Sequence, residues 1–393
     1  MLSNIHPFPA RMAPDIAEEC LGACASGSRV LDPMCGSGTV LRAAVEAGLD
    51  CTGIDIDPLA ALMSRVWVTP VAPSRITAAA DDVVRQARDL PRGQVERAPD
   101  HETRRFIAYW FARRQRRQLQ RLATVLHALR GRGQPEADAL AVVLSRIIIS
   151  KEMKASLARD TSHGRPHRVA DRNDFDVYRG FLAAAAAMAK RLAPELIRGN
   201  AEVLEGDARS LEGLDDDAFD LVVTSPPYLN AIDYLRGHKL TLVWLGYDIP
   251  VIRETRSISI GAEKAMAACE GQTDVSRYVA LTAGSTFASR HLGWVRRYAV
   301  DMRAVFGELA RVVKEQGRVV IVVGNSFLGG AAVDNASLVR DLAWQSGFQL
   351  VKSRRRPIPA NRRYLPPPQS GNNMLDARIR EETVLELRLL AHA

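Results

Sequence analysis

Several features that mark particular classes of protein are missing from this sequence of 393 residues. No apolar run is long enough to span a membrane, and the first residues lack the basic-then-apolar pattern of a secretory signal. We therefore expect a cytoplasmic protein. The five cysteines form no CxxC pair, which argues against a disulfide framework and against a zinc ribbon. We predict no metal site.

Acidic residues are outnumbered by basic ones, and the formal net charge is +8. Between Pro91 and Gly133 there are eleven arginines against three acids, and residues 352–363 hold six basic residues and no acid. Two separate arginine-rich runs in one chain favour a polyanionic partner, and we expect this partner to be nucleic acid.

The pattern of apolar residues predicts an α/β fold with a mostly parallel sheet. A strand, a glycine turn, a helix and a second strand occupy the first part of the chain, which is the order of a βαβ unit. Seven strands are expected, at 28–33, 51–57, 201–207, 219–225, 317–325, 348–355 and 382–390. The last two are joined by a proline- and arginine-rich loop without room for a crossover helix, so we expect them to pair antiparallel.

Strand signals are almost absent between residues 71 and 200, where helical periodicity dominates. We interpret 71–200 as a helical insertion between two parts of one domain, 1–70 and 201–393. Within it, 104–129 is expected to form one helix and 156–175 a polar loop. After the fourth strand, we expect a helix near 231–240, a rim loop at 256–261, and otherwise helix and loop up to residue 316.

The glycine turn "LDPMCGSGT" lies between a strand and a helix, so the backbone at Gly36 and Gly38 can approach a ligand closely. A dinucleotide site would place a third glycine where Leu41 stands, and the lysine of a phosphate-binding P-loop is also missing. Asp55, at the end of the second strand, can accept hydrogen bonds from ribose hydroxyls. Asp57 can serve instead as the N-cap of the next helix. An adenosine cofactor without phosphates fits this pattern, and S-adenosylmethionine is the candidate.

Five segments together resemble the amino-methyltransferases of DNA, which methylate cytosine N4 or adenine N6. They are 6–19 ("HPFPARMAPDIAEE"), 30–40 ("VLDPMCGSGTV"), 53–60 ("GIDIDPLA"), 206–209 ("GDAR") and 224–228 ("TSPPY"). The resemblance implies a seven-stranded, Rossmann-like class I methyltransferase sheet and S-adenosylmethionine as cofactor. The cofactor residues it implies are Phe8, Arg11, Asp32, Pro33, Met34, Cys35, Gly36, Gly38, Thr39, Asp55, Ile56 and Asp207.

Some of these assignments compete with plainer ones. The family often has an aromatic residue where this chain has Met34, which can pack against the cofactor without a ring's fixed shape. Phe8 belongs to a segment expected to fold over the cofactor, but it can equally be a core aromatic. Asp207 is expected near the adenine, or else serves as a turn residue.

The motif "SPPY" follows the fourth strand and supplies the predicted catalytic residues Ser225, Pro226, Pro227 and Tyr228. An exocyclic amine is a poor nucleophile, and it improves when acceptors hold its two hydrogens. The Ser225 hydroxyl and the Pro226 carbonyl can be those acceptors, while Tyr228 offers a ring on which a flipped base can stack. The chain contains no Pro-Cys pair, which argues against methylation of cytosine carbon 5.

Serine at position 225 favours cytosine N4 over adenine N6 in the family. The site-specific N4 methylation of cytosine in DNA is therefore the leading hypothesis. N6-adenine methylation, tRNA guanine-N2 methylation and a non-catalytic nucleic-acid-binding protein are the alternatives. The resemblance also makes a cognate restriction nuclease a candidate partner, besides double-stranded DNA. The sequence leaves the oligomeric state open.

Residues 71–200 are expected to recognise the target, with base contacts from the loop at 156–175 and backbone contacts from the second arginine run. The predicted DNA-binding residues are Arg159, His163, Arg165, His167, Arg168, Arg354, Arg355, Arg356, Arg362 and Arg363.

Overall fold

The computed structural model describes residues 5–9, 11–96, 98, 100–164, 166–229, 233–263, 274–281, 287–328, 330–358 and 380–390, without the side chain of His163. None of the helices in this part of the chain is both long and apolar enough to cross a membrane.

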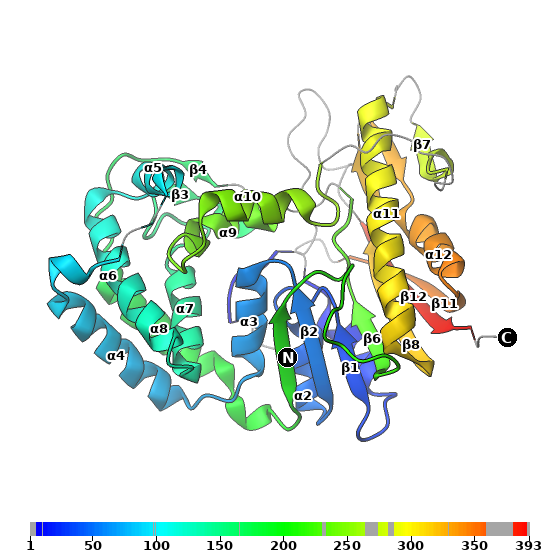
Figure 1. The fold of residues 1–393 in the computed structure, drawn as a ribbon, viewed down its shortest axis with the longest axis horizontal. Coiled ribbons are helices and arrows are strands. Elements are labelled where there is room, and N and C mark those ends of the chain that lie inside the picture. Colours follow the sequence, from blue (N-terminus) through cyan, green and yellow to red (C-terminus); the bar gives the residue numbers. More distant parts are fainter. Residues whose placement is uncertain are drawn as a thin grey trace.

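A seven-stranded sheet forms the centre of the molecule (Figure 1). Across the sheet the strands are β5 (Ala201–Glu205), β2 (Asp50–Asp55), β1 (Arg29–Asp32), β6 (Phe219–Thr224), β8 (Val313–Gly324), β12 (Glu381–Leu389) and β11 (Phe348–Pro357). The first five are parallel, and β12 is antiparallel to both β8 and β11. The predicted strands and the antiparallel final pair are confirmed.

Helices cover both faces of this sheet (Figure 1). The helices on one face are α1 (Pro14–Leu21), α2 (Thr39–Glu46) and α3 (Pro58–Val68), and those on the other are α11 (Ser289–Val312) and α12 (Asn335–Gln345). Neighbouring strand residues face opposite layers: Leu221 and Val223 pack with α1 and α2, whereas Val222 packs with α11. Both faces are buried, which explains the nearly continuous apolar runs of the parallel strands.

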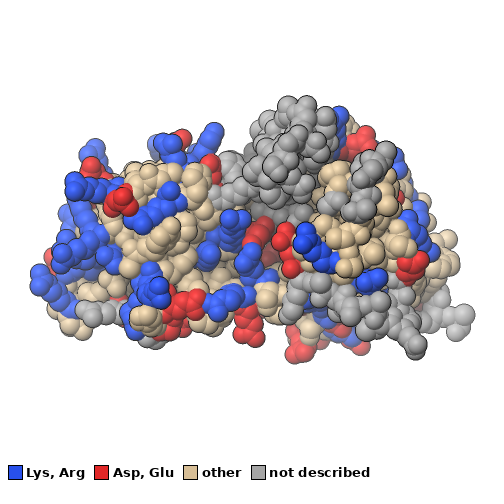
Figure 2. Space-filling model, turned by 90° about the horizontal axis from the view of Figure 1, so that it is seen from above, with Lys and Arg blue, Asp and Glu red and all other residues tan. Residues whose placement is uncertain are grey.

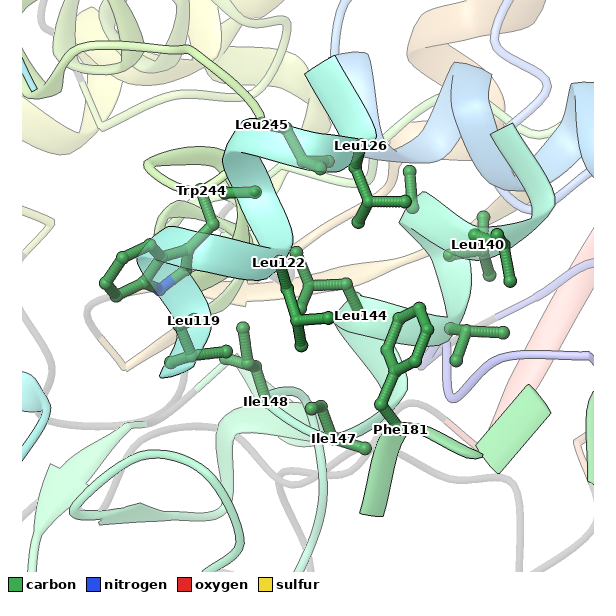
Figure 3. Packing of buried hydrophobic residues seen from close by; sticks show 14 of the residues in the cluster. Leu119, Leu122, Leu126, Leu140, Leu144, Ile147, Ile148, Phe181, Trp244 and Leu245 are labelled. Carbon is green, nitrogen blue, oxygen red and sulfur yellow. The ribbon is translucent and has the colours of Figure 1, made fainter. Parts of the chain in front are cut away.

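A helical lobe stands beside the sheet, on the left of Figure 1. Its helices are α4 (Pro73–Asp89), α5 (His101–Trp110), α6 (Arg113–Arg130), α7 (Pro135–Arg146), α8 (Val177–Leu192), α9 (Tyr234–Leu242) and α10 (Ile249–Ile258). Figure 3 shows its core, where Leu122 and Leu144 pack together with Trp244 and Leu245. The lobe therefore extends beyond the predicted insertion at 71–200, because α9, α10 and part of α3 share its core.

The expected helix over 104–129 is wrong in one respect, because α5 ends at Trp110 and α6 begins at Arg113. Phe111 between them is extended and fully buried, with its ring edge-on to Trp244 at a centroid distance of 5.1 Å. Tertiary packing of this one ring breaks a pattern that is helical on both sides. Another expectation also needs correction, because residues 256–258 form the last turn of α10 rather than a rim loop.

Short strands were also missed by the sequence patterns. The polar stretch 156–175 contains a hairpin of β3 (Ala158–Arg159) and β4 (His167–Arg168) around η2 (Thr161–His163). A small sheet joins β7 (Val279–Leu281), β10 (Ala331–Val333) and β9 (Ser326–Leu328). The remaining 3-10 helices are η1 (Arg92–Gln94), η3 (Pro194–Leu196) and η4 (Ser276–Tyr278). Strands of two or three residues are too short to show an alternating pattern.

Arg42 of α2 ties the sheet to the helical lobe. Its side chain is 2% exposed and forms an ion pair with Glu46 at 2.6 Å. Its guanidinium also donates to the carbonyl oxygens of Trp67 (2.8 Å), Leu192 (3.0 Å) and Ala193 (2.9 Å). One buried side chain thus satisfies backbone acceptors at the ends of α3 and α8.

We predict that Arg42→Leu lowers the free energy of unfolding by about 3 kcal/mol. The substitution leaves the Glu46 carboxylate and three backbone carbonyls without their hydrogen-bond donor. Urea denaturation followed by circular dichroism would measure the loss. Arg85→Leu on exposed α4 is the control and should change stability by no more than about 0.5 kcal/mol. Equal stability of the two variants would contradict the role of Arg42.

Candidate functional site

A cavity of about 620 Å³ opens at the carboxyl edge of the sheet. It lies where β1, β2 and β6 end, and α9 and α10 contribute further walls. Its size is within the range of small-molecule sites.

The glycine turn forms one wall of the cavity. Gly36 and Gly38 have φ angles of 52° and 83°, a region that side-chain-bearing residues rarely adopt. A Cβ atom on Gly36 would lie 3.2 Å from the Phe8 ring, and one on Gly38 would lie 2.9 Å from the Ser64 hydroxyl. The turn therefore requires glycine at both positions, for conformation and for space.

Asp55 closes the glycine turn against the end of β2. Its two carboxylate oxygens accept hydrogen bonds from the N–H of Gly36 at 2.7 Å and from the N–H of Asp57 at 2.9 Å. Burial, with the neighbouring Asp57 carboxylate, raises the pKa of Asp55 to about 7, although the two N–H donors oppose the shift. Asp55 also lines the cavity, so its remaining lone pairs can meet a ligand.

Asp32, the last residue of β1, is the second acid in the cavity wall and is 3% exposed. Burial raises its pKa to about 7, and the nearby Thr224 side chain and the hydrogen bond from the Met34 N–H only partly oppose this rise. Two carboxyl groups with raised pKa values in one cavity make it a candidate functional site.

The segment before α1 lies over the glycine turn. The Phe8 ring stacks on Tyr234 of α9 at 4.6 Å, and the Tyr234 hydroxyl donates to the Pro9 carbonyl at 3.2 Å. Phe8 is therefore a cavity wall as well as a packed aromatic. Asp57 takes the alternative role foreseen for it, accepting from the Leu59 N–H at 3.0 Å as the N-cap of α3.

His238 was not singled out in the sequence, yet it contacts two residues of this wall, Phe8 and Asp57. It is 3% exposed, and its Nδ1 lies 2.5 Å from the Asp57 carboxylate. Nothing in the sequence near 238 marks it, because its partner is 181 residues away.

Asp207 also lines the cavity, but its carboxylate is already engaged. Arg209 reaches it with Nε at 2.9 Å and with a terminal nitrogen at 2.5 Å, and binds Asp301 of α11 at 2.6 Å. Burial opposes ionisation of Asp207, but Arg209 outweighs it and lowers the pKa below the ordinary value. Asp207 is thus fixed in place as a charged acceptor.

The SPPY segment leaves β6 at the same edge. Ser225, Pro226, Pro227 and Tyr228 all line the cavity, and Pro226 is buried. The Ser326 hydroxyl donates to the Leu229 carbonyl at 2.6 Å and anchors the far end of the segment. Burial raises the pKa of the Tyr228 hydroxyl well above its ordinary value, so this side chain is neutral.

The structure therefore gathers nearly all predicted cofactor and catalytic residues around one cavity. Of the predicted cofactor residues, Gly38 alone does not line it. Ser257, Ser259, Ile260 and Gly261, which belong to the predicted rim segment 256–261, line the cavity. The lining residues of α9 and α10 that the prediction did not assign include Leu235, Arg236 and Arg253. They lie in helices whose orientation toward the cavity depends on the packing of the helical lobe.

The predicted DNA-binding residues that the structure describes lie outside the cavity wall. Arg159 pairs with Glu152 at 3.6 Å, and Arg168 pairs with Asp171 at 2.8 Å while its guanidinium lies 4.9 Å from the centre of the Tyr109 ring. His167 belongs to β4 and is exposed. Arg165, Arg362, Arg363 and the side chain of His163 lie outside the described part of the chain.

The second arginine run begins on β11, where two of its arginines form ion pairs with acidic residues of α1. Arg354 pairs with Glu19 of α1 at 2.7 Å, and Arg356 pairs with Asp15 at 3.0 Å. Arg355 between them is exposed. Part of this run therefore fastens α1 to the edge strand.

No family model matches the sequence. The chain is 22% identical to the type II methyltransferase M.MvaI of Kocuria varians, in an alignment of 420 residues that covers 94% of this chain and 86% of that protein. It is 45% identical to the type II methyltransferase M.BsoBI of Geobacillus stearothermophilus over 51 residues, which are 13% of this chain and 10% of that protein. The chain thus resembles type II methyltransferases, one of them over nearly its whole length.

Solved structures give weaker likenesses. A methyltransferase of Methanosarcina mazei described as S-adenosylmethionine-dependent has a TM-score of 0.35 and 10% identity, covering 97% of this chain and 99% of that one. A DNA modification methylase of Thermus thermophilus in complex with S-adenosylmethionine has a TM-score of 0.25 and 16% identity, covering 48% and 52%. Both TM-scores are below 0.5, so neither likeness supports a conclusion about function.

The raised pKa of Asp32 predicts a pH effect on the ligand-free protein. The folded state keeps a proton that the unfolded chain loses near pH 3.8, so the free energy of unfolding should fall between pH 3.8 and about 7. Each unit of pKa difference corresponds to about 1.4 kcal/mol. Denaturation across this pH range should show a smaller fall for Asp32→Asn than for the wild type. Asp81→Asn, at an exposed position of α4, is the control, and a fall for Asp32→Asn equal to that of the wild type would refute this account.

Proposed function

We propose that the protein transfers a methyl group from S-adenosylmethionine to the exocyclic N4 amine of cytosine in DNA. The observation that supports this proposal is the meeting of two residue sets in one cavity. Asp32, Gly36 and Asp55 line the same space as Ser225 and Tyr228, although the sequence separates the two sets by about 170 residues.

The cavity suits an adenosine cofactor without phosphates. The glycine turn leaves room for close approach of a ligand to the backbone, and no lysine stands in it to meet a phosphate. Asp55 offers carboxylate oxygens for the ribose hydroxyls, and Asp32 offers a negative charge to the methionine end. Arg209 holds the Asp207 carboxylate in place, and we expect the adenine of the cofactor to lie beside this carboxylate. When bound, S-adenosylmethionine supplies an already activated methyl group.

Ser225 and Pro226 prepare the amine for attack. The Ser225 hydroxyl oxygen and the Pro226 carbonyl oxygen accept the two amine hydrogens, and this turns the nitrogen lone pair toward the methyl donor. The two prolines fix the backbone, so the acceptors need no reorganisation when the base arrives. Tyr228 provides the ring against which the flipped base stacks. The residues of this chain thus act mainly by positioning.

DNA is the proposed substrate because of the basic charge and the similarity to type II methyltransferases. Figure 2, viewed from above the cavity, shows lysine and arginine side chains gathered over the helical lobe. We assign target recognition to this lobe, with the hairpin around Arg159, His167 and Arg168 as the reading element. Serine at position 225 is the feature that favours cytosine N4 over adenine N6.

We predict that incubation with S-adenosylmethionine and mixed-sequence DNA yields N4-methylcytosine, detected by mass spectrometry of the nucleosides. Ser225→Ala should lower kcat by about a hundredfold or more, since it removes one acceptor from the amine, and should leave cofactor affinity unchanged. Ser74→Ala, on the exposed start of α4, is the matched control. N6-methyladenine alone would overturn the base assignment, and methylation of RNA but not of DNA would overturn the substrate.

A second prediction concerns cofactor binding. A ligand that is positively charged near Asp32 and donates to Asp55 favours both carboxylates in ionised form. Because their pKa values are about 7 without ligand, binding below pH 7 should release protons, and affinity should rise as pH approaches 7. Calorimetry in two buffers of different ionisation enthalpy counts these protons. Asp32→Asn should release fewer, and proton uptake by the wild type would contradict the assignment.

A further inference from the structure

Three arginines from two helices line the mouth of the cavity, and Lys239 lies on one of the same helices. Arg236 and Lys239 lie one turn apart on α9, and Arg253 and Arg256 lie one turn apart on α10. The three arginines line the cavity that also holds Ser225, and all three are exposed. None belongs to either arginine-rich run of the sequence.

Helical spacing and mutual proximity make these cations one group. Residues three apart are neighbours on a helix surface, and α9 and α10 pack against each other. The Lys239 ammonium lies 5.4 Å from the centre of the Phe106 ring, and the residue is partly buried. Burial, then Arg256 and Arg236, lower the pKa of Lys239, while Asp233 opposes them. This places Lys239 within electrostatic reach of both Arg236 and Arg256.

Two of the arginines already form ion pairs with carboxylates. Arg256 pairs with Asp233 at 2.5 Å, and Arg253 pairs with Glu102 of α5. The arginine side chains in these pairs are 55% and 59% exposed. Exposed pairs of this kind contribute little to stability, so a stronger anionic ligand can displace the carboxylates. Among the described residues, no ion pair is recorded for the Arg236 guanidinium.

We propose that Arg236, Lys239, Arg253 and Arg256 bind the phosphodiester backbone of DNA beside the nucleotide whose base enters the cavity. The proposal rests on the proposed function and names the group that holds the flanking backbone. A flipped base lies inside the cavity against Tyr228, whereas its phosphates stay at the mouth in contact with solvent. Guanidinium groups suit such phosphates, because they bind two oxygens at once.

Salt dependence gives the direct test. The probe is a fluorescein-labelled DNA duplex of mixed sequence, and its affinity is measured by anisotropy for wild type and for Arg253→Gln/Arg256→Gln. The plot of log K against log salt has a negative slope, and each lost phosphate contact should make this slope shallower by about 0.9. The double variant should therefore lose about 1.8 from its magnitude. The wild-type advantage should therefore shrink roughly twelvefold between about 50 and 200 mM salt.

Two further variants separate contact from general charge. Arg85→Gln removes an equally exposed, acid-paired arginine from α4 and should leave the slope unchanged. Glu102→Gln lies outside the cavity wall and frees Arg253, so it should raise DNA affinity. Because all these side chains are exposed, the variants should fold. Arg85→Gln and Glu102→Gln, which lie outside the cavity wall, should keep the wild-type cofactor affinity measured by calorimetry.

The outcomes distinguish this proposal from the proposed function. If the wild type methylates DNA but the double variant and Arg85→Gln bind with the same slope, the backbone contact is overturned and the methyltransferase activity stands. If the wild type neither binds nor methylates DNA, both are overturned. Tighter binding of the wild type to a matched RNA duplex would assign the contact to RNA instead.

Discussion

The shared edge at which parallel strands end is the constraint on which this site depends. β1, β2 and β6 are neighbours in the sheet and run in the same direction, so Asp32, Asp55 and Ser225 reach one edge from distant parts of the chain. The Asp55 carboxylate then accepts an N–H from the glycine turn and another from the start of α3. Backbone geometry and the Asp55 carboxylate thus fix the glycine-turn wall of the cavity without help from a ligand.

Helix α9 connects the glycine-turn wall of the cavity to the helical lobe. Tyr234 and His238 lie one turn apart on the helix and contact Phe8 and Asp57 beside the glycine turn. The apolar residues after His238 join the core of the lobe. A shift of α9 would therefore disturb the cofactor wall and the cavity mouth together. This gives a physical route by which the two ligands of the proposed reaction could influence each other's binding.

The sheet was predictable because its signals are local: each strand is an apolar run bounded by turn residues. The glycine turn and the SPPY segment could be placed because strand ends in a parallel sheet share an edge. His238 and the break at Phe111 could not, since each depends on a partner far along the chain, Asp57 or Trp244. The role of Arg42 was hidden for the same reason. Its acceptors are backbone carbonyls, which leave no trace in the residue types.

Charge runs were a less reliable guide to binding surfaces than charge placement. Arg354 and Arg356 belong to the densest basic run, yet both form ion pairs with acidic residues of α1. Arg236, Arg253 and Arg256 are scattered in sequence and meet at the cavity mouth, because two helices fold back over the carboxyl edge. A count along the chain measures how many cations a segment has, whereas contact with a substrate depends on where those cations lie in the fold. The proposed phosphate contacts are therefore assigned to α9 and α10, whose arginines line the cavity, and not to Arg354 and Arg356 of β11, which do not.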